Sequence, residues 1–148
     1  MKKITALLLL ILLVQTSCDK IGKECGECFT PPPTFIFQFI DKDNGENLFS
    51  NNTFDINNVS VTDEKNEKVE FEYLTENGIN VLNLKLIGWN LDPKSYTIKL
   101  NDTTSVNFDL NMNEMHSECC SFFEIEHFEV YYYEYEREYN DGFIIVKM

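Results

Sequence analysis

The sequence predicts an all-β fold, a β-sandwich of about seven to nine strands, and three observations support this prediction. From Thr34 onwards, apolar residues alternate with polar ones at a period of two in almost every segment. Turn-forming residues such as Asn44-Gly45 and Asn140-Asp141-Gly142 interrupt this alternation about every 8–12 residues. No segment has the apolar spacing of an amphipathic helix.

The length and the charge of the chain limit the classes of protein to which it can belong. Its 148 residues are enough for one domain, which we place at residues 34–148. A hydrophobic content of 43% and an aromatic content of 14% exclude a disordered chain. The formal net charge of −13 disfavours nucleic acid and anionic membrane surfaces as partners.

The first residues have the pattern of a secretory signal. Met1-Lys2-Lys3 supplies positive charge, and the apolar stretch Ile4–Val14 follows with Thr5 as its only polar residue. As a helix, this stretch would span about 16 Å, roughly half of a bilayer core. The segment is therefore typical of a signal peptide and too short for a transmembrane helix.

The residues after the apolar stretch resemble the lipobox of bacterial lipoproteins. Small residues at Thr16 and Ser17 precede Cys18, although Gln15 replaces the usual aliphatic residue. The resemblance implies that residues 1–17 are a removed signal peptide and that Cys18 carries the lipid, palmitate included. The alternative is an ordinary signal peptide that is cleaved nearby.

The resemblance to lipoproteins implies a location in the bacterial cell envelope. We expect an anchor in the outer membrane, on its periplasmic or its surface face. Asp19 resembles the retention signal of inner-membrane lipoproteins in enterobacteria, so the inner membrane stays open as an alternative. Residues 18–33, which include the run Pro31–Pro33, predict a tether that holds the domain away from the membrane.

Four further cysteines, Cys25, Cys28, Cys119 and Cys120, predict two disulfides, because an exported chain folds under oxidising conditions. We favour two bridges from the first pair to the second over short bridges within each pair. Each would close a loop of about 90 residues, which stabilises a fold by up to about 4–5 kcal/mol in the chain-entropy model. Since adjacent side chains of a strand point to opposite faces, residues 119–120 must lie in a turn or a bulge.

A metal site is the alternative role for these cysteines. The four thiolates together would suit zinc. Copper(I) would suit a second set of soft ligands, which comprises Met112, Met115, His116, Cys119 and Cys120. A thioredoxin-type role for Cys25-Gly26-Glu27-Cys28 is disfavoured, because Pro31–Pro33 prevent the helix that such a motif requires. We expect no cofactor.

The strands of the domain follow from the alternation. Phe35–Ile40 begins the series, with phenylalanine at every second position. Val69, Phe71 and Tyr73 alternate with charged residues and give the clearest half-buried strand. The other predicted strands contain Val59–Val61, Val81–Leu86, Tyr96–Leu100, Val106–Met112, Phe122–Tyr139 and Phe143–Lys147.

Two resemblances extend this prediction. The segment Val59–Met112 resembles immunoglobulin-like and transthyretin-like modules, in which a Val-x-Val strand meets a later strand of the type Leu91–Leu100. That resemblance implies a sandwich of the same type. The segment Cys28–Pro32, together with Asp41-Lys42 and Gly45–Phe49, resembles small lipoproteins of Bacteroidetes-type bacteria. It implies a localisation and a fold but no activity.

The run from Tyr131 to Tyr139 is the most unusual in the chain. As one strand it would place Tyr131, Tyr133, Tyr135 and Tyr139 on one face and glutamates on the other. Such an aromatic face would bind sugars or peptides, because rigid rings supply contact area at little entropic cost. The alternative is that the tyrosines pack one sheet on the other.

The chain is not expected to be an enzyme. Neither His116 nor His127 is accompanied by a catalytic-triad motif, a zinc-protease motif or a phosphate-binding glycine loop. We therefore expect a lipid-anchored, non-catalytic module that contacts an envelope protein or glycan. Binding of a soft metal, copper or zinc, is the alternative function.

Overall fold

The computed structural model describes residues 28–76, 78–117, 120–137 and 142–148, which form an all-β sandwich. Within these ranges the ten strands are β1 (Cys28–Thr30), β2 (Phe35–Ile40), β3 (Ser60–Asp63), β4 (Glu72–Glu76), β5 (Ile79–Leu84), β6 (Lys94–Lys99), β7 (Ser105–His116), β8 (Cys120–Tyr131), β9 (Glu134–Arg137) and β10 (Phe143–Lys147). The 3₁₀ helices η1 (Ile56–Asn58) and η2 (Ile87–Trp89) lie in the connections. The predicted fold class is confirmed.

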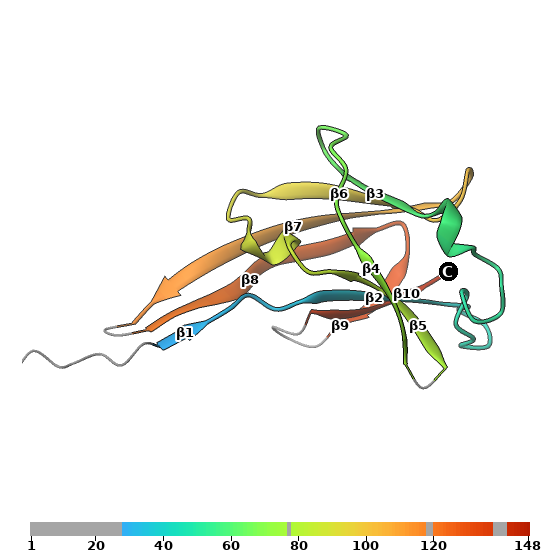
Figure 1. The fold of residues 1–148 in the computed structure, drawn as a ribbon, viewed down its shortest axis with the longest axis horizontal. Coiled ribbons are helices and arrows are strands. Elements are labelled where there is room, and N and C mark those ends of the chain that lie inside the picture. The colour runs from blue at the N-terminus through green and yellow to red at the C-terminus, as the bar shows by residue number, and fades with distance from the viewer. Residues whose placement is uncertain (1–27, 77, 118–119, 138–141) are drawn as a thin grey trace, which may run out of the picture.

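The strands form two sheets of five, which we name after their central strands (Figure 1). The β7 sheet has the order β1-β8-β7-β6-β3, and the β2 sheet has the order β4-β5-β2-β10-β9. Neighbouring strands are antiparallel, except that β1 is parallel to β8 and β2 is parallel to β10. The described part of the chain therefore starts with an edge strand of one sheet, β1, and continues with the central strand of the other sheet, β2.

Alternate residues of the strands point into one core between the sheets. β2 contributes Phe35, Phe37 and Phe39, which are fully buried, as the alternation predicted. Their rings contact rings of the β7 sheet, and the centroids of Phe37 and Phe108 are 4.8 Å apart. Other buried side chains of the two sheets are Val61, Leu82, Leu84, Tyr96, Ile98, Val106, Leu110, Met112, Ile125, Phe128, Val130, Ile144 and Val146. Because each large apolar side chain contributes about 1.5–3 kcal/mol when it leaves water, this core is the main source of stability.

Ten strands among the described residues exceed the predicted seven to nine, for two reasons. β1 forms inside the range that was predicted to be a tether. The predicted strand Phe122–Tyr139 divides into β8 in one sheet and β9 in the other. The immunoglobulin-like or transthyretin-like type stays a prediction.

The end of the predicted tether belongs to the domain. β1 pairs with β8, and Pro32 is buried. Pro32 and Pro33 lie so close to Gly88 of η2 that a Cβ atom at residue 88 would be 3.0 Å from Pro32 Cβ and from Pro33 O. The proline run therefore packs on the fold and is not a free spacer there. The predicted signal peptide (1–17), the predicted lipid site Cys18 and the rest of the tether lie outside the described residues.

Two strand boundaries differ from the prediction because the chain changes direction there. Val69, Phe71 and Tyr73 do pack on the core, but β4 begins only at Glu72. The residues before β4 still bond to the edge of the β7 sheet, where the Val69 N–H donates to a carbonyl of β3. At the end of β5, Leu86 is exposed because the chain turns into η2.

The hairpin of β7 and β8 extends toward the end of the molecule where β1 begins (Figure 1). Backbone hydrogen bonds between Ser117 and Cys120 close this hairpin. In the part of the chain that the structure describes, no helix is both long enough and apolar enough to cross a membrane.

Candidate functional site

The predicted aromatic face of the tyrosine run does not form. β8 ends at Tyr131, the backbone turns at Tyr132 with a φ of 68°, and β9 follows in the other sheet. Tyr131 and Tyr135 therefore lie in different sheets, while Tyr133 and Tyr135 pack on the core. The prediction of one shared face is wrong, because alternation does not show where a chain changes sheets. Tyr139 lies outside the described residues.

Hydrogen bonds hold two of these tyrosines in place. Tyr131 Oη donates to Asp109 Oδ2 at 2.5 Å. This bond, followed by desolvation and by nearby negative charge, raises the pKa of the Tyr131 phenol to about 12. Tyr135 Oη donates to the carbonyl oxygen of Phe128 at 3.1 Å, and its ring packs edge-on against the Phe128 ring. The Tyr135 contacts join the two sheets, as the alternative interpretation expected, whereas the Tyr131 hydrogen bond lies within the β7 sheet.

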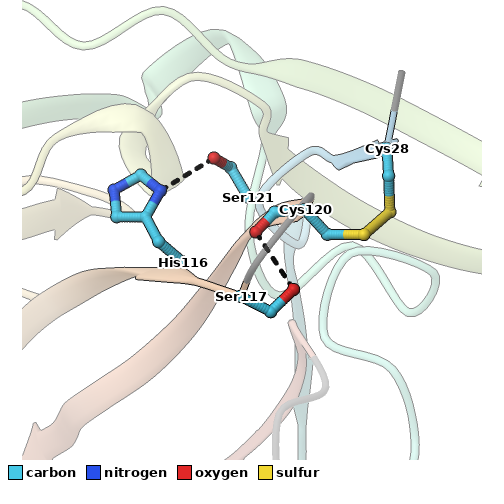
Figure 2. Close-up of a disulfide and its surroundings, with 5 residues drawn as sticks. All are labelled: Cys28, His116, Ser117, Cys120 and Ser121. Carbon is cyan, nitrogen blue, oxygen red and sulfur yellow. Dashed lines mark hydrogen bonds between the residues drawn. A yellow bond between two sulfur atoms is a disulfide. The ribbon is translucent and has the colours of Figure 1, made fainter. Parts of the chain in front are cut away.

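A disulfide joins Cys28 on β1 to Cys120 on β8 (Figure 2). The two residues are directly opposite in the parallel strand pair, with Cα atoms 4.6 Å apart, and they are separated by 92 residues in the sequence. A long bridge from the first cysteine pair to the second is thus confirmed. Cys25 and Cys119, which the other predicted bridge would join, lie outside the described residues.

The described members of the proposed metal cluster do not come together. Met112 points into the core, whereas Met115 lies on the outer face of β7. His116 Nδ1 is 2.9 Å from Ser121 Oγ, and the Cys120 sulfur is bonded to Cys28 (Figure 2). Within the described ranges, no group of three or more His, Cys, Asp or Glu side chains could hold a metal ion.

An exposed aromatic cluster lies next to the disulfide. It comprises Phe29 of β1, Trp89 of η2 and Phe123 of β8. Phe29 stacks on Trp89 with centroids 6.0 Å apart and an interplanar angle of 21°, and Trp89 meets Phe123 edge-on at 5.5 Å. Phe29 is 56% exposed and Trp89 is 49% exposed, although both rings are large and apolar. We call these three residues the aromatic cluster.

Three contacts position the aromatic cluster. The disulfide fixes β1 at the residue before Phe29. The close packing of Pro32 on Gly88 fixes η2 at the residue before Trp89. Phe123 itself packs on the core. This site was hard to predict from the sequence, because three distant segments supply one ring each. The usable signal was the single tryptophan, a residue type typical of binding surfaces.

The two sheets present different outer faces. On β7 and β8 the outward residues include the acidic Asp109, Glu124, Glu126 and Glu129, and we call this side the acidic face. Its other members are Asn107, Asn111, Asn113, Met115, Phe122, His127 and Tyr131. On the β2 sheet the outward residues of the central strands are mostly apolar, and we call them the apolar face; it comprises Ile36, Gln38, Ile40, Leu74, Ile79, Val81, Asn83, Phe143 and Ile145. The charged residues Glu72, Glu134, Glu136 and Lys147 point to the same side of the sheet. We therefore expect the acidic face to meet water or polar partners and the apolar face to suit apolar partners.

A pocket of about 330 Å³ lies at the edge of the apolar face, lined by Glu70, Phe71, Glu72, Asn83, Lys85 and Leu86. Lys85 Nζ and Glu72 Oε2 form an ion pair at 2.7 Å on its rim. Asn83 is 5% exposed, and its Oδ1 atom accepts no hydrogen bond. Since an unpaired buried amide oxygen is destabilising, this site favours a partner that supplies a donor.

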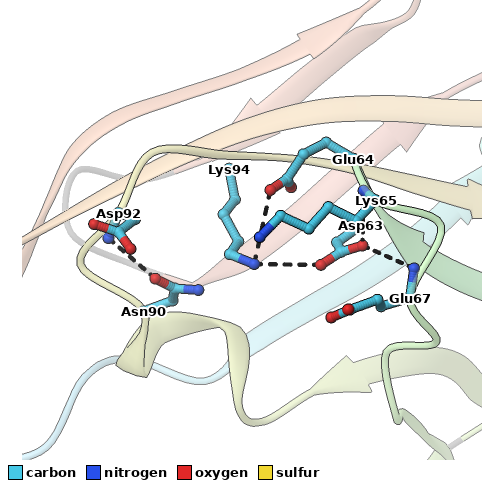
Figure 3. A network of polar contacts seen from close by, with 7 residues as sticks. All are labelled: Asp63, Glu64, Lys65, Glu67, Asn90, Asp92 and Lys94. Carbon is cyan, nitrogen blue, oxygen red and sulfur yellow. Dashed lines mark hydrogen bonds and ion pairs between the residues drawn. The ribbon is translucent and has the colours of Figure 1, made fainter.

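A polar network connects the turn after β3 to β6 (Figure 3). Asp63 accepts hydrogen bonds from the backbone N–H groups of Lys65 at 3.0 Å and Glu67 at 2.9 Å, and from Lys94 Nζ at 3.2 Å. Burial by itself raises the pKa of Asp63, but these bonds outweigh burial and lower the pKa overall. The hydrogen bond to Asp63 raises the pKa of Lys94. The pair therefore stays charged at neutral pH, and its role is structural.

Comparisons with protein-family models, with curated proteins and with solved structures find no match to this chain. The likeness to small lipoproteins of Bacteroidetes-type bacteria therefore stays a prediction. Two surfaces of the described residues are suited to binding: the aromatic cluster, and the apolar face with the pocket at its edge.

Proposed function

We propose that this chain is a lipid-anchored protein of the bacterial outer membrane that binds an envelope glycan or protein and is not a catalyst. The signal-peptide pattern and Cys18 support the anchor. The aromatic cluster supports the binding function, and it replaces the tyrosine run as the contact surface.

The stacked, half-exposed rings of Phe29 and Trp89 are the observation on which the binding function rests. Apolar surface in water costs about 25 cal/mol per Å², so a ligand that covers the rings is favoured. The ring faces suit the apolar side of a sugar ring or an aliphatic side chain. Because the disulfide and the Gly88 contact already fix the cluster, little conformational entropy is lost on binding.

The place of the cluster in the chain adds a constraint on the ligand. The aromatic cluster lies next to Cys28, where the described chain begins. If Cys18 carries the lipid, the segment from Cys18 to Cys28 reaches at most about 35 Å. The cluster then works close to the bilayer, which favours ligands held near the membrane surface.

Fluorescence of Trp89 tests the binding function, because Trp89 is the only tryptophan in the chain. Envelope glycans and detergent-solubilised envelope proteins are titrated into the full-length protein. We expect a saturable change in emission, with binding about tenfold weaker in Phe29→Ala.

Phe122→Ala is the matched control for this titration. Phe122 is 37% exposed and precedes a cluster residue on β8, but it takes part in none of the described ring contacts. Affinity should therefore stay unchanged in Phe122→Ala. The absence of a saturable change, or an equal loss in both variants, would contradict the proposed contact surface.

Metabolic labelling with palmitate tests the anchor independently of the ligand. Label should be present in the wild-type protein and in Cys25→Ala. It should be absent from Cys18→Ala, which should also leave the membrane fraction. Label that persists in Cys18→Ala would disprove lipidation at this residue.

A further inference from the structure

We propose that the domain also rests directly on the lipid bilayer, through exposed apolar side chains that flank the aromatic cluster. These side chains are Leu86, Leu91, Met115 and Phe122, and we call them the apolar rim. The inference rests on the lipid anchor of the proposed function. It adds a second, non-covalent contact with the membrane, which is made by none of the three ring residues.

Exposed apolar side chains are concentrated at one end of the domain. Nine large apolar side chains of the described residues are exposed, and six of them belong to β1, to the segment 86–91 around η2, or to the paired ends of β7 and β8. These six are Phe29, Leu86, Trp89, Leu91, Met115 and Phe122. Single exposed apolar residues are common on proteins, whereas a contiguous group marks an interaction surface. This end of the domain is therefore suited to an apolar partner.

Strand pairing and ring contacts bring these segments together. Met115 is directly opposite Phe122 on the β7–β8 hairpin, and Phe122 lies on the strand that pairs with β1. The Phe29 ring of β1 stacks on the Trp89 ring of η2. The Trp89 N–H donates to the Leu86 carbonyl oxygen at 3.2 Å. The two pairs of rim residues therefore flank the aromatic cluster, one pair on the hairpin and one pair beside η2.

The anchor is attached at this same end of the domain. The described chain begins at Cys28, and β1 lies beside the end of the β7–β8 hairpin (Figure 1). With the lipid on Cys18, as proposed, the link from the bilayer to Cys28 reaches at most about 35 Å. A short link raises the local concentration of the domain at the bilayer to the order of millimolar, so that even a weak contact is populated. The bilayer is therefore the apolar partner within constant reach of the rim.

Charge determines which kind of membrane contact is open to this chain. Many lipidated proteins add a basic patch, which binds anionic lipid, as a second attachment. A chain with a net charge of −13 is repelled by anionic lipid, so an apolar contact with neutral lipid is what remains. Lys85 and Asp92, the charged neighbours of Leu86 and Leu91, limit the depth of this contact, because a charge is costly in the hydrocarbon layer. The contact is therefore at the level of the headgroups, where tryptophan is also favoured.

Quenching of Trp89 emission by brominated lipid tests this contact in the lipidated protein. Trp89 is the only tryptophan in the chain, and it lies between Leu86 and Leu91 in the sequence. The protein is reconstituted in vesicles of zwitterionic phosphatidylcholine that carries bromine either near the headgroup or near the bilayer centre. We expect bromine near the headgroup to quench Trp89 at least about twofold more strongly, because the contact is interfacial.

Leu86→Asp and Leu91→Asp should each release the domain from the bilayer. A carboxylate at either position favours water over the interface, so quenching should fall at least about twofold. Leu86 occupies the N-cap position of η2 without a side-chain cap bond, and aspartate is a good N-cap residue, so this variant should keep the fold. Ile79→Asp is the matched control, because Ile79 is 44% exposed, as is Leu91, but lies at the end of β5 farthest from η2. Its quenching should equal that of the wild type.

Vesicle flotation distinguishes failure of this contact from failure of the anchor. A wild-type protein that floats with the vesicles but shows no quenching has its anchor and lacks the contact, which overturns the proposal. A protein that does not float contradicts the anchor and, with it, the contact. Stronger quenching by bromine near the bilayer centre, unchanged quenching in folded Leu86→Asp and Leu91→Asp proteins, or an equal loss in Ile79→Asp would also overturn the proposal. Association between copies that depends on Leu86, without quenching, would do the same and would assign the rim to a second copy.

Discussion

The acidic face and the apolar face are built on strands that pack on the same core, yet their outward residues differ. On β7, Asn107 and Asp109 alternate with the buried Val106 and Phe108. On β2, the outward neighbours of the buried phenylalanines are isoleucines and one glutamine. The buried half of the pattern is the same in both sheets, so it reports only on the shared core. The outward half is what distinguishes a face that meets water from one that is suited to a partner.

The largest loss of stability is expected from a change at Phe37, a side chain of the β2 sheet that packs on the β7 sheet. Phe37 is fully buried and its ring contacts the rings of Phe108 and Phe128 across the core. Phe37→Ala should lower the free energy of unfolding by about 3–5 kcal/mol in urea titrations, because it removes contacts and leaves a cavity. The neighbouring Ile36→Ala, on the apolar face, should cost about 1 kcal/mol. Similar losses in both variants would show that the inner and outer sides of β2 are not distinct.

The next largest effect is expected from reduction of the disulfide, which lies in the β7 sheet and not in the β2 sheet. The disulfide fixes only β1 of the β7 sheet, and it closes a loop between residues 92 positions apart. Reduction should lower the free energy of unfolding by about 3 kcal/mol. Under conditions in which the protein stays folded, Trp89 emission should also shift to the red, because Phe29 no longer stacks on the Trp89 ring and water reaches it. Unchanged emission after complete reduction would contradict the role assigned to the bridge.

A smaller effect, on the pH dependence of stability, is expected from Asp63, a buried carboxylate at the edge of the β7 sheet. The pKa of Asp63 is lower in the folded protein than its ordinary value of 3.8. Asp63 therefore adds stability above that value, and this contribution is lost as the pH falls through the folded pKa. Asp63→Asn should lower the Tm by about 5 °C at pH 7 and flatten the decline of Tm in acid.

Asp92→Asn serves as the control for this measurement, because Asp92 is an exposed carboxylate in the same region (Figure 3). Its Tm should follow that of the wild type at every pH. An acid decline that is equally steep in Asp63→Asn and in the wild type would contradict the assignment of the shift to Asp63.

The smallest effect is a change in the pKa of Tyr131, whose hydroxyl group bonds to Asp109 on the acidic face. The hydrogen bond to Asp109 raises the pKa of Tyr131 to about 12, so its contribution to stability is present below pH 10 and is lost as the pH rises towards 12. Absorbance titration should show that one tyrosine ionises at lower pH in Asp109→Asn than in the wild type. Identical titration curves would show that the acidic face does not perturb Tyr131.

Local features of the fold were predictable from the sequence. The burial of Phe35, Phe37 and Phe39 follows from the pleat of a single strand, which places alternate side chains on one face. The turn at Asn44-Gly45 follows from the conformational freedom of glycine, and Gly45 has a φ of 76°. The long bridge at Cys28 followed from the spacing of the cysteine pairs and from the expectation of an oxidising compartment.

Features that depend on pairing between distant segments were not predictable in this way. The rings of the aromatic cluster come from β1, η2 and β8, and only the pairing of β1 with β8 and the packing of η2 bring them together. The tyrosine run shows the reverse case, in which a regular pattern continues while the chain leaves one sheet for another. Alternation determines which side of a strand a residue occupies, but not which strand lies beside it.

The position of β10 has a consequence for folding of the chain during its synthesis. β10 lies inside the β2 sheet, between β2 and β9, and its Phe143 pairs with Ile36 near the other end of the chain. During synthesis from the N terminus, β2 is therefore completed long before the neighbouring strand β10 that completes its hydrogen bonding. In that interval its apolar sequence is open to pairing with other emerging chains. The high negative charge of the chain then has a protective role, since it keeps unfolded copies apart until residues 143–147 arrive.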